Sequence, residues 1–427
     1  MTAPAIHATE LLVAEAVSAA HRASAAIAKA PDAAIDRALR AMARLLSEST
    51  DVVLAANRED QEAATASGMS GGVLDRLRLD PARLVAMAAQ INALADVPVE
   101  PVRRRIRDLD GDLVLEEWRR PVGVIGANFE ARPNVAVDIA SQLIKSHNAG
   151  VLRTGSAALG SASALMDYVV GPALAAADLP PAAMQLVRAR GHEAAEALVR
   201  HPTQMPLVIL RGSGESTRSL AQLAATHGVR TLAHADGGAV IYVDAAADPA
   251  RARQVISASL DRLGVCNRLN LLLIHRDRYV ELVPSFVELL AAREPSITAS
   301  LPPHPHRLGY EWALDPTAEA TVTIAESSGP ADAARIANEE TSGLAAAIVT
   351  EDADAAAEFL AEYTGTGAFW NATTRLLDGF KLLAVPETGI NIDRVPGPRG
   401  PVTYRDLSLR QYVVVPAARA AQIQDQR

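Results

Sequence analysis

The feature that most constrains the fold is an alternation of short apolar runs with stretches of helical periodicity along most of the 427 residues. Apolar residues make up 49% of the chain but aromatic residues only 4%, so a core must consist mainly of Ala, Val, Leu and Ile. This composition is typical of helices packed on parallel strands. The strands that we predict span 121–126, 151–152, 207–210, 239–243, 271–274, 321–324, 345–350 and 368–370. Right-handed crossovers would join them, so we expect an α/β protein with doubly wound parallel sheets.

The chain length predicts two or three domains. The first hundred residues are predicted to be helical, because Ile35, Leu39 and Met42 recur at spacings of three and four. We expect a first α/β unit over 1–247 and a second over 248–386. Residues 102–120 mix apolar and charged side chains around Asp110-Gly111, a dipeptide that favours tight hairpin turns, so they predict a projecting two-stranded arm.

Charge and cysteine content exclude several classes of protein. With 41 basic and 50 acidic residues the net charge is −9, and acids closely follow the arginines of 103–107, so we expect no nucleic-acid partner. A single cysteine cannot form an internal disulfide, and Glu10 and Glu15 interrupt the region where a secretory signal would lie. No apolar run approaches the roughly 18 to 20 residues of a membrane span. We therefore expect a cytoplasmic protein without a membrane partner.

Three features could carry chemistry. Cys266 lies beside Gly264 in a helix-to-strand turn, where it is either a nucleophile or a small buried hydrophobe. The segments 153–156 and 211–214 each follow a strand and contain arginine and glycine, as an anion site or an ordinary turn would. The paired arginines favour a phosphorylated cofactor. His304 and His306 lack a third ligand nearby in sequence, so we expect no metal.

Several segments are similar to one known family. They are Val122-Gly-Val-Ile-Gly126, Glu130-Ala-Arg-Pro-Asn-Val135, Leu143-Ile-Lys-Ser-His-Asn148, Leu152-Arg-Thr-Gly-Ser156, Gly264-Val-Cys-Asn267, Asn371-Ala-Thr-Thr-Arg375 and Asp378-Gly379. Together they resemble the gamma-glutamyl phosphate reductase family, also called glutamate-5-semialdehyde dehydrogenases, of the aldehyde dehydrogenase superfamily. The resemblance runs in order from about residue 35 to 415.

The resemblance implies a fold and a reaction. It implies two Rossmann-like domains, for cofactor (1–247) and catalysis (248–386), and an oligomerisation arm from 102–120 and 398–418 that would form a homodimer or homotetramer. The implied reaction reduces L-glutamyl 5-phosphate with NADPH through a thioester on Cys266, as a step of proline biosynthesis. The upstream kinase is a further implied partner.

The resemblance also implies roles for individual residues. The backbone N–H of Cys266 and the amide of Asn134 would stabilise the oxyanion. The residues expected to contact NADP(H) are Arg153, Gly155, Ser156, Arg211, Gly212, Gly214 and Glu387. The residues expected to contact substrate are Arg132, Asn267, Arg268, Asn371 and Arg375.

Departures from the family pattern leave alternatives open. The family's His-Gly-Asp-Gly-x-Cys-His is His234-Ala-Asp-Gly-Gly-Ala-Val240 here, and polar residues are also replaced at Gly343-Leu-Ala-Ala346 and Asn267-Arg-Leu-Asn-Leu271. These losses favour, as alternatives, a reductase of another acyl phosphate or an inactive scaffold. The segment 234–238 contains no glutamate that could activate water, which argues against a hydrolytic aldehyde dehydrogenase.

Overall fold

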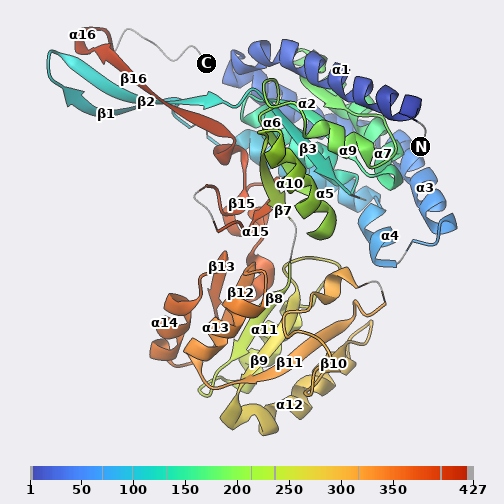
Figure 1. Cartoon of the computed structure of the whole chain (residues 1–427), viewed down its shortest axis with the longest axis vertical. Helices are drawn as coiled ribbons and strands as arrows, with labels where there is room; N and C mark the ends of the chain where they lie inside the picture. Colours follow the sequence, from blue (N-terminus) through green and yellow to red (C-terminus); the bar gives the residue numbers. More distant parts are fainter. Residues whose placement is uncertain are drawn as a thin grey trace.

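The computed structural model describes residues 3–69, 71–98, 100–130, 132–212, 214–234, 237–315, 317–394 and 397–420. Figure 1 shows an upper lobe that contains the N-terminal helices, a lower lobe built from the middle of the chain, and a narrow arm that projects from the upper lobe. The C-terminal part of the chain runs from the lower lobe back to the upper lobe and then into the arm (Figure 1).

The N-terminal region is helical, as predicted. Its helices are α1 (Ala3–Ala28), α2 (Asp32–Glu48), α3 (Thr50–Ala66), α4 (Gly71–Leu77) and α5 (Pro81–Asp96). The stripe Ile35, Leu39, Met42 and Leu46 of α2 is buried, as its spacing of three and four requires. Residues of α1, α2, α3 and α5 share one core with the first sheet, whereas Leu77 of α4 packs with Ala64 and Ala158 in a separate small cluster.

Two helical segments, 7–28 and 156–176, have the length and mean hydropathy of a membrane span. The sequence expectation missed them because alanines raise the mean hydropathy without producing a long strictly apolar run. In the fold both segments supply core residues, among them Val13, Val17, Leu165 and Val169, which are fully buried. A core helix of a globular protein passes the same test of length and composition.

The first sheet contains β3 (Val124–Phe129), β4 (Ala149–Thr154), β5 (Met184–Leu186), β6 (Leu207–Arg211) and β7 (Arg230–His234). All neighbouring strands are parallel, in the order β5-β4-β3-β6-β7. The helical segments that connect them are α6 (Asn134–Lys145), η1 (Ser156–Ala158), α7 (Leu159–Leu165), η2 (Met166–Val170), α8 (Gly171–Ala176), η3 (Pro181–Ala183), α9 (Glu193–Leu198) and α10 (Gly214–Thr226). The strand order reverses between β3 and β6, and ligands of such sheets bind at the carboxyl ends of the strands beside that reversal.

The second sheet contains β8 (Ala239–Val243), β9 (Leu269–His275), β10 (Thr298–Ser300), β11 (Thr321–Ser327), β12 (Ala345–Val349) and β13 (Gly367–Trp370). Its strands are parallel, in the order β10-β11-β9-β8-β12-β13. The associated helices are α11 (Pro249–Ala258), α12 (Arg276–Ala291), η4 (Trp312–Leu314), α13 (Pro330–Glu340), α14 (Ala353–Glu362), η5 (Thr374–Leu376) and α15 (Gly379–Leu383).

The boundary predicted at 247 is placed too late. β8 lies inside the second sheet, between β9 and β12. Ile241 and Val243 pack into the core on one face of that sheet, whereas Val240 and Tyr242 pack into the core on the other face. The second lobe therefore begins between His234 and Ala239, because a strand buried on both faces must belong to the sheet that covers it.

The C-terminal return also differs from the prediction of an arm over 398–418. β14 (Gly389–Asn391) pairs with β15 (Gly400–Val402), and η6 (Tyr404–Asp406) follows. Val402 and Leu407 pack into the core of the upper lobe. The arm itself receives only β16 (Ser408–Pro416) and the short α16 (Ala417–Ala420).

The predicted hairpin is confirmed. β1 (Arg103–Leu109) and β2 (Leu113–Pro121) pair antiparallel around Gly111, whose positive φ of 75° suits glycine. β16 adds a third antiparallel strand along β2. Within the arm, Arg103 forms an ion pair with Glu116 at 2.8 Å, so acidic residues do compensate this arginine cluster.

Candidate active site

Cys266 lies in the turn that joins α11 to β9, at the amino end of the second sheet. Its carbonyl accepts a hydrogen bond from the Gly238 N–H at 2.8 Å, which ties the turn to the segment before β8. The next residue, Asn267, is buried and donates from its amide to the Leu377 carbonyl at 2.9 Å. The backbone around the sulfur is therefore fixed from two sides.

Gly237 approaches Cys266 more closely than any other residue type would allow. A Cβ at this glycine would lie 2.7 Å from both the Cα and the Cβ of Cys266. The Gly237 N–H donates to Glu311 Oε2 at 2.9 Å, and its carbonyl accepts from Ser342 Oγ at 2.8 Å. The glycine lets this strand of backbone lie directly against the cysteine. Residues 235 and 236 of the same segment lie outside the described residues.

The thiol of Cys266 is half-buried between an apolar wall and several charges. The wall includes Ala239, Leu344 and Ile390. Burial raises the pKa of the Cys266 thiol to about 11, the positive charge of Arg132 opposes this rise, and the negative charge of Glu387 adds to it. The cation is thus the neighbour that favours the reactive thiolate.

The first residues of α6 and the Cys266 turn offer hydrogen-bond donors. Asn134 donates one amide hydrogen to Asp138 Oδ2 at 2.8 Å, one helical turn further on, which leaves its second amide hydrogen available. Within the described part of the chain, the Cys266 backbone N–H donates no hydrogen bond. Two donors are therefore available for the oxyanion of a tetrahedral intermediate.

Arg132 and Arg211 make no hydrogen bond or ion pair with the residues that the structure describes. Burial lowers the pKa of Arg132 to about 10, and the positive charge of Arg211 lowers it further. Two half-buried guanidinium groups without a protein partner favour the binding of an anionic ligand.

Acidic groups surround Arg211. Burial raises the pKa of Glu387 to about 7, and Arg211 opposes this rise. Burial likewise raises the pKa of Asp138 to about 6. His234, at the end of β7, has a pKa lowered to about 4 by burial, so it is neutral near pH 7. Perturbed titration behaviour of this kind concentrates at functional sites.

The reversal of strand order in the first sheet fits a dinucleotide. Arg211 is the last residue of β6 and Gly212 follows it. A Cβ on Gly212 would lie 3.0 Å from the carboxyl carbon of Glu130, which follows β3. Gly212 thus lets the Glu130 carboxyl group lie directly against the backbone, and Gly214 begins α10 just beyond this contact. On the neighbouring strand, Gly155 donates to the Phe129 carbonyl at 2.9 Å and precedes the exposed Ser156.

Arg153 occupies a different position from the one that we predicted. Its side chain is buried, and its guanidinium donates to Asn128 Oδ1 at 3.0 Å and to the Gly191 carbonyl at 2.5 Å. Arg153, near the end of β4, therefore joins the end of β3 to the loop at Gly191, and both terminal nitrogens of its guanidinium already have protein partners. Arg190 is exposed beside Gly191 and makes no hydrogen bond with the described residues, so it is the better candidate for a phosphate contact.

Most of the predicted substrate contacts turn out to support the Cys266 turn. Arg268 is fully buried, and it donates to the backbone carbonyls of Leu269, Glu319 and Thr321. Arg268 therefore has no surface for a substrate. Arg375 donates to Asn267 Oδ1 and, at 2.6 Å, to Asp261.

Asn371 closes the end of β12, where its side chain exchanges hydrogen bonds with the backbone of Thr350. Arg132, another predicted substrate contact, interacts electrostatically with Cys266.

The sequence reasoning missed Asp138, His234 and Glu311. The spacing of four between Asn134 and Asp138 on a predicted helix was a usable signal. Nothing in the sequence pattern indicated Glu311, because it comes from a loop more than forty residues beyond Cys266 and is brought there by the fold.

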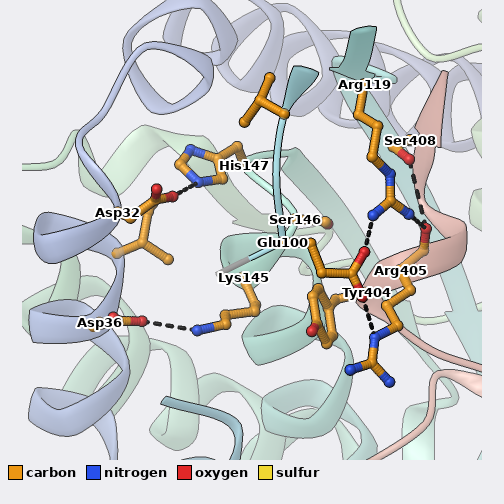
Figure 2. A pocket seen from close by; sticks show the side chains of 12 residues that line it. Asp32, Asp36, Glu100, Arg119, Lys145, Ser146, His147, Tyr404, Arg405 and Ser408 are labelled. Carbon is orange, nitrogen blue, oxygen red and sulfur yellow. Dashed lines mark hydrogen bonds and ion pairs between the residues drawn. The ribbon is translucent and has the colours of Figure 1, made fainter. Parts of the chain in front are cut away.

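A pocket of about 70 Å³ lies at the base of the arm, and its lining includes none of the residues described around Cys266 (Figure 2). There Lys145 pairs with Asp36 at 2.9 Å, and Glu100 accepts from both Arg119 and Arg405. The charges largely compensate one another and the lining contains no cysteine, so the pocket joins the arm to the helices and is not the reactive site.

His304 and His306, the pair considered above as possible metal ligands, both lie against the hydroxyl group of Ser300. Ser300 Oγ contacts His306 Nε2 at 2.8 Å and His304 Nδ1 at 3.4 Å. Among the described residues, no group of three His, Cys, Asp or Glu side chains is arranged to hold a metal.

The fold and this site define a class of enzyme. The chain belongs to the aldehyde dehydrogenase family, whose model matches residues 2–297. It is an oxidoreductase of a family that uses a nicotinamide cofactor.

Within that family, the chain is similar to proteins named gamma-glutamyl phosphate reductase. It is 34% identical to the one from Synechococcus elongatus, over 88% of each chain, and 33% identical to the one from Clavibacter michiganensis, over 93% of each. The crystal structure of gamma-glutamyl phosphate reductase from Thermotoga maritima superposes with a TM-score of 0.84 at 26% identity, covering 94% of this chain and 98% of that one.

Proposed function

We propose that the protein reduces L-glutamyl 5-phosphate to glutamate 5-semialdehyde with NADPH, as a step of proline biosynthesis. The observation that carries the proposal is the position of Cys266, beside Arg132 and within reach of the charges of Arg211 and Glu387. Similarity to gamma-glutamyl phosphate reductases over most of both chains supports this choice of reaction.

The chain's own residues would act as follows. The Cys266 thiolate attacks the acyl carbon, and the Cys266 N–H and the Asn134 amide stabilise the oxyanion. Collapse of this intermediate breaks the bond to the phosphate oxygen, releases phosphate and leaves a thioester. When bound, the nicotinamide cofactor would supply the hydride that reduces the thioester held on Cys266. Expulsion of the Cys266 thiolate then completes the aldehyde.

The proposal assigns the cofactor to the carboxyl edge of the first sheet. Gly212 and Gly214 would approach its pyrophosphate, and Glu387 would hold the ribose of its nicotinamide half. Segment 153–156 contains no carboxylate that would favour a ribose hydroxyl, and Arg190 offers a cation, so the edge favours NADPH over NADH.

We also propose a cytoplasmic homodimer or homotetramer that forms through the arm and receives its unstable substrate from the upstream kinase. Leu409, Tyr412 and Val414 of β16 are large apolar side chains that are half or more exposed. Exposed apolar side chains on a projecting strand favour an interface.

The reverse reaction tests the proposed function. Purified protein with glutamate 5-semialdehyde and NADP should form NADPH only when phosphate is present, and Cys266→Ser should lower the rate by about 10⁴-fold or more. Undiminished NADPH formation without phosphate would show hydrolysis instead. Equal rates with unrelated aldehydes would contradict glutamyl specificity. Failure to bind NADPH, together with an unreactive Cys266, would favour a scaffold.

A further inference from the structure

Arg76 reaches from the upper lobe to the turn that carries Cys266. It belongs to α4, which Figure 1 shows on the side of the upper lobe that faces the lower lobe. Its Nε lies 3.4 Å from the position that a Cβ on Gly264 would occupy, two residues before Cys266. Its Nη2 donates to the Ala313 carbonyl at 3.3 Å, whereas its Nε is buried and has no hydrogen-bond partner among the described residues.

A carboxylate lies against the same glycine. Glu319 Oε1 is 3.0 Å from the Gly264 Cβ position. Within the described residues, neither Glu319 nor Arg76 forms an ion pair. Neighbouring charges do: Arg262 pairs with Asp75 at 2.9 Å. A cation and a carboxylate thus flank one residue of the turn that carries Cys266. The charge of Glu319 also acts on the buried Arg268, whereas the buried Nε of Arg76 has no hydrogen-bond partner among the described residues, so a ligand carboxylate would complete Arg76.

The spacing matches the proposed substrate. The α-carbon of a glutamyl group is three C–C bonds from its acyl carbon, which is about 4 Å along the chain. Gly264 is two residues from Cys266, so their Cα atoms are separated by at most about 7 Å. A glutamyl group attached at Cys266 is therefore long enough to bring its α-carboxylate and α-ammonium to Gly264, which the side chains of Arg76 and Glu319 contact.

We propose that Arg76 and Glu319 bind the amino-acid end of the substrate, Arg76 through the α-carboxylate and Glu319 through the α-ammonium group. This assignment rests on the proposed function and adds the residues that select the substrate. It supplies polar partners where the chain lacks several that its family shows. The match is electrostatic: a zwitterion meets one positive and one negative side chain, and an analogue that lacks either group leaves one charge unmatched.

Kinetics with three aldehydes separate the two contacts. The aldehydes are glutamate 5-semialdehyde, 5-oxopentanoate, which lacks the amino group, and 4-aminobutanal, which lacks the carboxylate. Arg76→Gln should raise KM roughly 10- to 100-fold for the two carboxylates and leave 4-aminobutanal unchanged. Glu319→Gln should raise KM for the two amines and leave 5-oxopentanoate unchanged. Arg78→Gln and Glu326→Gln are matched controls at exposed positions nearby in sequence.

Several results would overturn the assignment. One such result is an equal change of KM for all three aldehydes, and another is no change of KM for any of them. A raised KM for phosphate in Arg76→Gln would also contradict the assignment. Thermal unfolding monitors the fold of each variant.

A second readout needs no turnover. L-glutamate should slow alkylation of Cys266 in the wild type but not in Arg76→Gln or Glu319→Gln. If L-glutamate protects Cys266 but the protein does not oxidise glutamate 5-semialdehyde, the proposed function is contradicted and the binding site is supported. If the protein is active and neither Arg76→Gln nor Glu319→Gln changes KM or protection, only the binding site is contradicted.

Discussion

At the scale of single residues, the reactivity of Cys266 is set by the balance between burial and charge. Burial raises the thiol pKa, and the positive charge of Arg132 is the strongest influence that lowers it. Alkylation of the cofactor-free protein should therefore accelerate steadily from pH 7 to pH 10, without a plateau near neutral pH.

Arg132→Gln should slow alkylation by iodoacetamide at pH 8 by roughly threefold to tenfold, because the thiol pKa rises further when the cation is removed. The rate of loss of free thiol measures this. Arg78→Gln, which removes an exposed arginine, is the control. An unchanged or faster rate in Arg132→Gln would show that this cation does not act on the sulfur.

Glu387 should make stability depend on pH. Its pKa is raised to about 7 by burial, whereas the unfolded chain ionises at the ordinary value of 4.5. Between these values the folded protein retains a proton that the unfolded chain has lost, so the free energy of unfolding contributed by Glu387 falls as pH rises from about 4.5 to 7.

Glu387→Gln removes the pH-dependent contribution of Glu387 to the free energy of unfolding. The variant should gain about 1 to 3 kcal/mol of stability relative to wild type at pH 8, with no gain at pH 4. Urea unfolding of the variant and the wild type at pH 4 and pH 8 measures this difference in stability. Both proteins contain His234, so its opposite pH dependence cancels in the comparison. A gain of equal size at both pH values would refute the proposed ionisation.

At the scale of helices and strands, the residue pattern predicted those elements that are buried on both sides. β3, β6, β9 and β12 lie near their predicted positions, because a run of Val, Ile, Leu and Ala is visible in sequence. β7 was not predicted because it is an edge strand that contains Arg230, Thr231 and His234 and lacks an apolar run. β5 was not predicted because it has only three residues. The domain boundary was predicted after β8 instead of before it for a related reason. The residues of a strand do not reveal which sheet the strand joins.

The arm provides a prediction at this scale. Tyr412 and Val414 lie two residues apart on β16, so their side chains share one face of the strand. If this face forms the subunit interface, the double variant Tyr412→Asp/Val414→Asp should dissociate the assembly while each chain stays folded. Sedimentation measures the mass, with Glu358→Asp, an acidic-to-acidic change on α14, as the control. An unchanged mass would exclude this face.

At the scale of the whole molecule, the site exists only because two lobes and a return segment meet. The nucleophile comes from the second sheet, Arg132 and Asn134 from the first, and Glu387 from the segment that runs back. Sequence resemblance predicted these residues one by one. It did not distinguish contacts to substrate from the bonds by which Asn267, Arg268 and Arg375 support the turn, because that difference depends on where each side chain points in the folded chain.

The most direct measurement of the central claim is the intact mass of protein mixed with NADP and glutamate 5-semialdehyde in the absence of phosphate. If Cys266 carries the acyl group, the wild type should gain the mass of one glutamyl group, phosphate should remove it, and Cys266→Ser should gain nothing. NADPH formation without any adduct on the cysteine, or an equal adduct on Cys266→Ser, would contradict the account.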